Sequence, residues 1–330
     1  MKTTITLSAV LTLALALLAS ACGGDSGSGG STAAGGGSLS GRIQADGSST
    51  VGPFVTRAAE EFQQQNSGVQ VTVGISGTGG GFERFCAGET DISDASRPIK
   101  DEEEQACKAK GVEHVEFQIA NDALTVVVNK ENDWAKCLTV DELAKIWAPG
   151  SKVGNWNQVR PSFPDQELKL FGPGTDSGTF DYFTGEINGE EGASRSDYSP
   201  SEDDNVIVQG VSGEKGGLGY FGFSYFEENQ DTLNAVEVDG GNGCVAPSVE
   251  TAQDGSYKPL SRPLFVYVKQ ASFDKPEVKA FVEYMLDNAD TIAGETQYVP
   301  LTQEQIDTAK AAFEQASGGS GGGTTTETTG

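Results

Sequence analysis

The sequence predicts an α/β fold in which short buried strands alternate with amphipathic helices around a central sheet. From Gly41 onward, β-rich apolar runs alternate with segments whose apolar residues recur at helical spacing. The β-rich runs are short and almost continuously apolar, as strands covered on both faces are. About 280 residues, positions 41–316, carry this pattern, which is enough for two lobes with cores of their own.

The expected strands are rich in β-branched and apolar residues and are bounded by glycine or polar residues. They are 42–45, 70–75, 115–119, 124–129, 168–171, 219–221, 236–238 and 264–268. The expected helices are 53–65, 81–87, 100–110, 140–147, 178–184, 206–212, 276–288 and 303–315. Thr139 and Glu142 have the spacing of a capping box, and the apolar residues from Val278 to Met285 form one stripe on a helix.

Two segments have the character of crossings between lobes. They are Ala123–Val128 and Pro263–Val268, each of which follows a polar loop and enters a β-rich stretch. If both are hinge strands, residues 41–124 and 264–316 form the first lobe and residues 125–263 form the second. Such a hinge suits closure around a ligand.

The first residues have the features of an export signal. Lys2 is followed by an apolar run over 5–19 and by small residues that end at Ala21-Cys22. The run is shorter than the roughly 20 residues that a membrane-spanning helix needs. We expect a lipoprotein signal peptide over 1–21, with Cys22 acylated and the protein anchored to the outer face of the cytoplasmic membrane. Ordinary secretory cleavage that leaves Cys22 free is the alternative.

Both ends of the exported chain are expected to lack fixed structure. Residues 22–40 and 317–330 consist largely of Gly, Ser, Ala and Thr, which offer few side chains to bury. We interpret the first as a flexible tether and the second as a disordered tail without an assigned role.

The remaining cysteines fit an oxidising compartment. They are Cys86, Cys107, Cys137 and Cys244, an even number in an exported chain. Three pairings are open, and the spacing favours Cys86 with Cys107 and Cys137 with Cys244. Metal ligation is the competing interpretation, but the chain has no CxxC pair and one histidine. We therefore expect no metal and no cofactor.

The formal net charge of −26 excludes a nucleic-acid binder of the usual kind, because a polyanion would be repelled. An anion ligand would need local donors. Three glycine–hydroxyl segments offer them, each between an expected strand and an expected helix. We call them loop A (46–50, DGSST), loop B (76–81, SGTGGG) and loop C (172–179, GPGTDSGT). A helix start presents unpaired N–H groups to an oxyanion, glycine allows close approach, and hydroxyls add donors.

Two further segments combine an arginine with small hydroxyl residues. Segment D (91–98, DISDASRP) contains Ser96 and Arg97, and the segment 193–198 contains Arg195. Arginine suits phosphate recognition, although exposed arginines usually form salt bridges. Each loop alone could be an ordinary helix cap. None matches a nucleotide-binding loop ending in Gly-Lys-Ser/Thr.

Together, the motifs 46–50, 76–82, 91–100, 138–147 and 171–183, which contain loops A, B and C and segment D, resemble the phosphate-binding proteins of the high-affinity phosphate ABC importer, and the stretch 210–226 strengthens the resemblance. The resemblance covers nearly all of the chain between its glycine-rich ends, and loop C is its most specific part. It implies a type II periplasmic-binding-protein fold: two lobes joined by a two-strand hinge with a central ligand cleft. It further implies a monomeric receptor, not an enzyme, that binds inorganic phosphate and delivers it to the permease subunits of an ABC importer.

The resemblance also implies the ligand-binding residues. Carried over by position, they are Ser49 and Thr50 in loop A, Ser76 and Thr78 in loop B, Ser96 in segment D, and Ser177, Gly178 and Thr179 in loop C. This chain departs from some relatives, which have a carboxylate where it has Ser96 and an arginine where it has Pro173-Gly174. Asp46, Asp176 and Arg195 are the candidates to replace them. An ionised Asp would accept a hydrogen bond from the P–OH group of hydrogen phosphate and would repel sulfate, which carries no proton.

Three other functions remain open from the residues alone. A binding protein for sulfate, molybdate or tungstate would use the same kind of helix start. A secreted phosphatase or a serine hydrolase using Ser177 would need a base, and the single histidine, His114, lies in a charged segment away from any nucleophile in the sequence. A structural surface protein would show no ligand-induced stabilisation.

Overall fold

The computed structural model describes residues 39–318. The expected signal peptide, the lipidation site Cys22, most of the tether and positions 319–330 lie outside the described residues. Between residues 39 and 318, none of the helices is both long and apolar enough to cross a membrane.

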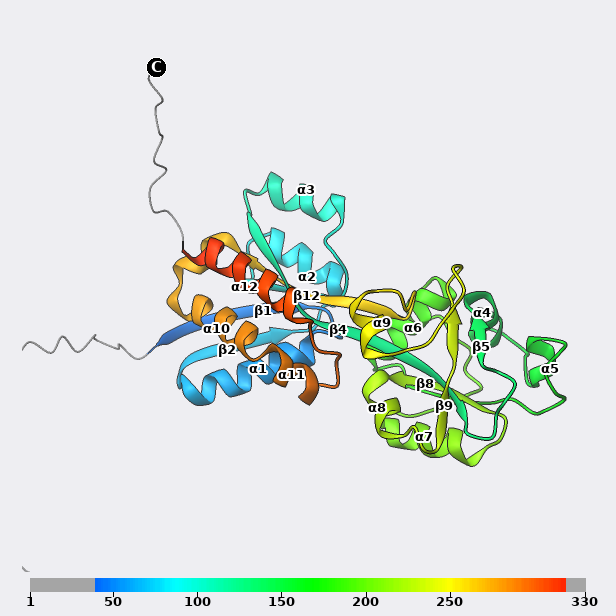
Figure 1. The fold of residues 1–330 in the computed structure, drawn as a ribbon. Coiled ribbons are helices and arrows are strands. Elements are labelled where there is room, and N and C mark those ends of the chain that lie inside the picture. Colours follow the sequence, from blue (N-terminus) through cyan, green and yellow to red (C-terminus); the bar gives the residue numbers. More distant parts are fainter. Residues whose placement is uncertain (1–38, 319–330) are drawn as a thin grey trace, which may run out of the picture. The chain divides into compact units, whose positions relative to one another are not determined.

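The described residues form an α/β structure, as the sequence predicts (Figure 1). The strands are β1 Ser40–Gly47, β2 Gly68–Gly74, β3 Ile92–Ala95, β4 His114–Asn129, β5 Cys137–Thr139, β6 Lys169–Gly172, β7 Ser199–Pro200, β8 Gly217–Gly222, β9 Leu233–Ala235, β10 Glu237–Asp239, β11 Cys244–Val245 and β12 Ser261–Lys269. The α-helices are α1 Gly52–Gln65, α2 Gly77–Cys86, α3 Asp101–Ala109, α4 Val140–Trp147, α5 Trp156–Val159, α6 Gly178–Asn188, α7 Asp204–Gly213, α8 Phe223–Glu228, α9 Val249–Gln253, α10 Pro276–Asp287, α11 Ala289–Glu295 and α12 Gln303–Ser317; a 3-10 helix covers Gln270–Asp274.

One sheet runs through the described structure in the order β2-β1-β3-β12-β4-β8-β6-β7, with β9 paired to β4. A small second sheet has the order β11-β10-β5. Strand β1 is parallel to β2 and β3, and β6 is parallel to β8, whereas β12 and β4 run antiparallel to their neighbours. The carboxyl ends of β1 and β3 therefore lie at one edge of the sheet, where loop A follows β1 and the last residues of segment D, 96–98, follow β3.

Strand β4 connects the two halves of the sheet. Its first part pairs with β12 and its second part pairs with β8, and Figure 1 shows β4 and β12 side by side. The sequence predicted two strands with a break near Asn121-Asp122, and this break is wrong. The strand continues because both polar residues have partners: Asn121 exchanges backbone hydrogen bonds with Val299, and the Asp122 carboxylate pairs with Arg262.

Apolar side chains form separate clusters on the two sides of this crossing. The first cluster contains Phe54 and Phe281 and draws its buried residues from positions 43–120 and 264–316. The second contains Trp147 and Tyr220 and draws its buried residues from positions 124–260. The lobe boundaries at 124/125 and 263/264 stay a prediction; Leu124 itself belongs to the second cluster.

Helix α2 begins at Gly77, four residues before the predicted start at 81. Loop B is therefore largely the first turn of a helix. Its run of glycines is untypical of helices but is explained by packing, because a Cβ built on Gly81 would lie 2.6 Å from Gly47 Cα and 2.8 Å from the Asp46 carbonyl oxygen. Glycine at this position lets α2 rest directly on the backbone of loop A.

Two disulfides are present, Cys86–Cys107 and Cys137–Cys244, and this is the pairing that the spacing favours. The first joins α2 to α3, and the second joins β5 to β11 across a sequence separation of 107.

Replacing Cys137 and Cys244 together with serine is expected to lower the free energy of unfolding by about 2–5 kcal/mol, because the closed loop restricts the unfolded chain. Denaturant unfolding with and without the disulfide measures this change. A loss below about 1 kcal/mol would contradict a stabilising role.

Candidate functional site

A cleft of ≈ 520 Å³ lies where β12 crosses between the two halves of the sheet. One side of the cleft is formed by loop B and segment D, and the other by α6. Arg262 and Pro263 of β12 complete the lining. Of the ligand-binding residues that the sequence analysis predicted, Ser76, Thr78 and Ser96 line this cleft.

Loop A joins β1 to α1 and is fixed by hydrogen bonds of Ser48 within the turn before α1. Ser48 Oγ accepts hydrogen bonds from the N–H groups of Thr50 and Val51, at 3.2 and 3.4 Å. The Ser48 N–H donates to the Asp94 carbonyl at 2.9 Å, which ties loop A to β3. Because the Ser48 hydroxyl makes these turn-forming bonds, the side chains of Ser49 and Thr50 are left for other contacts.

Loop B leaves the start of α2 without a side-chain cap. The Ser76 N–H and hydroxyl both donate to Asp46 Oδ1, at 3.0 and 2.7 Å, and the Ser76 side chain caps none of the amides of α2. Thr78 Oγ1 lies 3.1 Å from Ser96 Oγ and accepts from the Ser96 N–H at 3.3 Å. Loop B and segment D are thus joined, and the first-turn amides of α2 are available to an anion.

Loop C begins α6, with Ser177 Oγ accepting from the Thr179 N–H at 3.2 Å. A Cβ built on Gly178 would lie 3.1 Å from Thr50 Oγ1 and 3.4 Å from Ser49 Oγ. Loops A and C therefore touch, although one follows β1 and the other follows β6. Neither lines the cleft itself. Thr50 connects them to it, because its Oγ1 accepts a hydrogen bond from Arg262 at 2.8 Å.

The two candidate acceptor carboxylates have different surroundings. Asp46 is only 2 % exposed; besides the donors of Ser76, it pairs with the guanidinium of Arg84. Asp176 is exposed, and its N–H donates to Glu202 Oε1 at 3.4 Å. Neither is among the residues that line the cleft.

The sequence did not single out Asp94, which lies on β3 beside loop A. Its side chain is fully buried, and among the described residues neither carboxylate oxygen has a hydrogen-bond partner. Burial and, to a smaller extent, the nearby charge of Asp46 raise the pKa of Asp94 to about 8. The local signal was weak, because an aspartate between Ser93 and Ala95 resembles a loop residue.

The raised pKa predicts a pH dependence of stability. Unfolding returns Asp94 to its ordinary pKa of 3.8, so its stabilising contribution is complete below about pH 4 and is lost as the pH rises to about 8. We expect Asp94→Asn to gain stability relative to the wild type between pH 5 and pH 8, by about 1.4 kcal/mol per pH unit at most. Unfolding curves at both pH values measure this difference. A difference that is the same at both would contradict the raised pKa.

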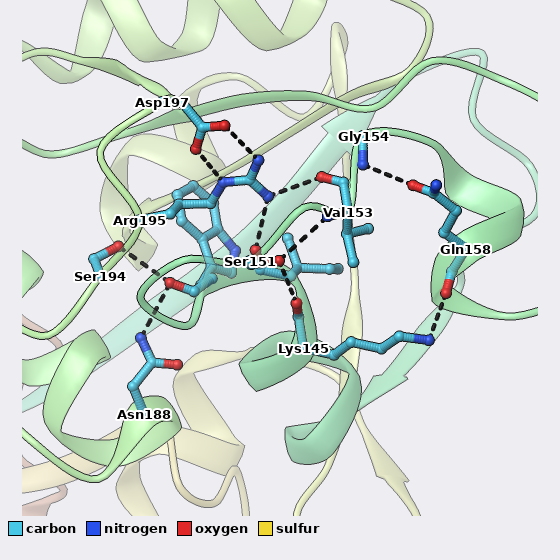
Figure 2. A network of polar contacts seen from close by, with 11 residues as sticks. Lys145, Ser151, Val153, Gly154, Gln158, Asn188, Ser194, Arg195 and Asp197 are labelled. Atoms are coloured by element: carbon cyan, nitrogen blue, oxygen red, sulfur yellow. Dashed lines mark hydrogen bonds and ion pairs between the residues drawn. The ribbon is translucent and has the colours of Figure 1, made fainter.

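Arg195 does not lie with loops A and B. It is 7 % exposed, and its Nη1 donates to the carbonyls of Ile146 and Val153 at 3.0 and 2.8 Å. Its Nε and Nη2 donate to the two carboxylate oxygens of Asp197 (Figure 2). The guanidinium thereby fastens its own segment to the end of α4. It borders a hollow lined by Ser194 and Tyr198, which is distinct from the cleft.

Arg262, which the sequence analysis did not name as a candidate, lines the cleft. Its Nε donates to Asp122 Oδ2 at 3.2 Å, and its guanidinium carbon lies 3.5 Å from the centre of the Tyr182 ring. Burial raises the pKa of Asp122, and the charge of Arg262 opposes that rise. The only sign of this role in the sequence was the position of Arg262 directly before Pro263–Val268, the segment expected to cross between the lobes.

The two sides of the cleft carry opposite charges. Segment D and the start of α3 contribute Arg97 and Lys100, and α6 with the residues after it contributes Glu186 and Glu191. Arg97 is already paired, since its Nη1 and Nη2 donate to Glu103 at 2.8 and 2.7 Å. An anion in the cleft would therefore find few uncommitted cations.

Comparison with known proteins gives consistent results. The PBP superfamily domain matches residues 32–289. Protein SphX of Synechococcus elongatus is 50% identical over 274 residues, covering 82% of this chain and 81% of the relative. The phosphate-binding protein PstS of Staphylococcus saprophyticus is 40% identical over 294 residues, covering 87% of each chain.

A solved structure described as a possible phosphate binding protein from Planctomyces limnophilus is also similar. It is 48% identical, with a TM-score of 0.82, and the match covers 84% of this chain and 99% of that one. The predicted two-lobe α/β fold is confirmed by this likeness and by the family match.

Proposed function

Because the chain belongs to the PBP superfamily and, within it, to the family of the PstS phosphate-binding proteins, we propose that it captures inorganic phosphate for an ABC importer. Relatives named phosphate-binding protein PstS match this chain over 87% and 89% of their own length. The proposal adds that this chain is an exported receptor and not an enzyme.

One observation supports the proposal above the others: three glycine–hydroxyl segments, far apart in the sequence, come together beside one cleft. Loop A touches loop C at Gly178, and loop B packs on loop A at Gly81. The uncapped start of α2 and the start of α6 are thereby brought into one small region next to loop A. Converging helix starts suit a small tetrahedral oxyanion.

These donors explain how an acidic protein could hold an anion. The charge of −26 is spread over the chain, and its field is screened over about 8 Å in physiological salt. Hydrogen bonds to a charged group act at contact and contribute roughly 1.5–3 kcal/mol each. We assign them to the hydroxyls and amides of Ser49, Thr50, Ser76, Thr78, Ser96, Ser177, Gly178 and Thr179.

The carboxylate that distinguishes hydrogen phosphate from sulfate stays a prediction for Asp46 or Asp176. Asp46 is the better placed, because it already orients Ser76 of loop B. Binding of phosphate between the two sides of the cleft would favour a closed arrangement of the lobes. In that arrangement Lys100 would approach the acidic residues of α6.

The remaining parts of the proposal concern location and partners. Two disulfides favour an oxidising compartment outside the cytoplasm. We further propose anchoring through an acylated Cys22, action as a monomer, and delivery to the permease subunits of the importer. A hydrolase using Ser177 is disfavoured, because His114 instead contacts Glu104 at 2.8 Å and packs beside Phe85 and Tyr267.

Calorimetry of the purified protein, stripped of bound anion, tests the function. We expect binding of phosphate at one site, with weaker or no binding of sulfate and molybdate. Because neutral donors provide most of the contacts, the affinity should change little with salt. Preference for sulfate or molybdate would contradict the proposal, as would turnover of a chromogenic phosphate ester.

A further inference from the structure

Arg262 is held in a fixed orientation between the two lobes. Its side chain is 15% exposed, and it comes from β12, one of the two strands that cross between them. On one side it donates to Thr50 Oγ1 of loop A, and on the other its guanidinium lies over the ring of Tyr182 in α6. A stacked, ion-paired arginine has lost most of its conformational freedom before any ligand arrives.

The guanidinium still has donors to offer. Of its five N–H groups, Nε–H is taken by Asp122 and one N–H of Nη2 by Thr50. The other three have no acceptor within residues 39–318, and Arg262 lines the cleft. Arg195, by contrast, has four hydrogen bonds to protein acceptors, and Arg97 is committed to Glu103 and the Pro98 carbonyl.

We propose that Arg262 is the cationic ligand of the bound oxyanion and also holds Thr50 in its binding position. The proposal rests on the proposed function and names a residue of the same site. It explains how this chain can have Pro173-Gly174 where some relatives have an arginine: the positive charge at the ligand comes from the crossing strand β12 and not from loop C. Asp122 balances that charge while the cleft is empty and is bound through the Nε of Arg262, which leaves the Nη groups for other acceptors.

This arrangement gives one residue contact with both lobes and the ligand. Thr50 belongs to the side that carries loops A and B, and Tyr182 belongs to α6. An oxyanion that accepts from the free N–H groups of Arg262 would therefore be linked to both sides through a single side chain. Lysine could provide the charge but not the fork of donors.

The test must separate ligand binding from a purely structural role. Replacing Arg262 alone would leave the buried carboxylate of Asp122 without its partner. The double variant Arg262→Gln/Asp122→Asn avoids this, because two neutral amides replace the ion pair. Arg160→Gln is the matched control, since Arg160 also pairs with a carboxylate, Glu142, and stacks on an aromatic ring, Phe163, but does not line the cleft.

We expect the double variant to bind phosphate about 10- to 100-fold more weakly than the wild type in calorimetry, with a melting temperature close to that of the wild type. Arg160→Gln should bind within twofold of the wild type. Arg262→Lys, which keeps the charge opposite Asp122, should lose about tenfold and provides the measurement if the double variant does not fold. A double variant or lysine variant with wild-type affinity would overturn the role of Arg262.

The outcomes distinguish this inference from the proposed function. A wild type that binds phosphate together with unaffected Arg262 variants overturns only the inference. A wild type that prefers sulfate or molybdate overturns phosphate as the ligand, and the same variants titrated with the preferred oxyanion then decide the role of Arg262. A wild type that binds none of the three overturns both.

Discussion

Gly81→Ala is expected to weaken phosphate binding by about 100-fold or more. The new Cβ would meet Gly47 Cα at 2.6 Å and the Asp46 carbonyl oxygen at 2.8 Å. Both are backbone atoms of loop A, so no flexible side chain can move aside. Loop A must shift away from α2, and the donors of Ser49 and Thr50 shift with it. Loss of two hydrogen bonds to a charged ligand accounts for roughly 3–6 kcal/mol of binding free energy.

The same substitution is also expected to lower the free energy of unfolding. Overpacking costs about 1–3 kcal/mol, whereas alanine improves on glycine inside a helix by only about 0.5–1 kcal/mol. Gly294→Ala is the matched control, because this helical glycine has open space around the position of its Cβ. The control should bind phosphate normally and be slightly more stable. Wild-type affinity in Gly81→Ala, measured by calorimetry, would contradict the contact between loops A and B as a requirement for binding.

Arg195→Met is expected to lower the free energy of unfolding by about 2–4 kcal/mol while leaving the affinity for phosphate within threefold. The carbonyls of Ile146 and Val153 would each lose a buried donor, at roughly 1–3 kcal/mol apiece. Loss of the pair with Asp197 adds little, because that carboxylate is 61% exposed and water replaces the guanidinium.

Denaturant unfolding and calorimetry on the same preparation measure both effects. Lys169→Met removes a surface ion pair with Glu167 and should change stability by less than about 0.5 kcal/mol. If Arg195→Met instead lost more than tenfold in affinity at unchanged stability, Arg195 would belong to the ligand site and the role of Arg262 would need revision.

The sequence predicted most of the longer elements because their local signals agree. Helix α4 begins and ends where predicted, since its capping box at Thr139 and its apolar face point to the same span. Strand β3 was missed because its residues include Ser93 and Asp94, which are untypical of a buried strand. The start of α2 was misplaced because Gly81 serves a tertiary contact that helix propensity opposes. Short strands such as β5 and β11 depend on pairing with distant segments.

In the candidate site, too, residues with a local sequence pattern were predicted and residues whose role depends on distant partners were missed. Loops A, B and C were found because glycine and hydroxyl residues before a helix are a local pattern. The partners of an arginine are not local: Arg195 and Arg262 look alike in the sequence, and only the fold places one against the carbonyls of α4 and its loop and the other against Thr50. Asp94 escaped notice for the same reason, because its burial is created by strands far away in the chain.

A crystal structure of the anion-stripped protein with added phosphate tests the central claim most directly. The account predicts a single phosphate in the cleft, within hydrogen-bonding distance of the first-turn amides of α2 and α6, the Thr50 hydroxyl and the guanidinium of Arg262. Phosphate bound at a surface remote from these groups, or a cleft that stays empty at saturating phosphate, would contradict it.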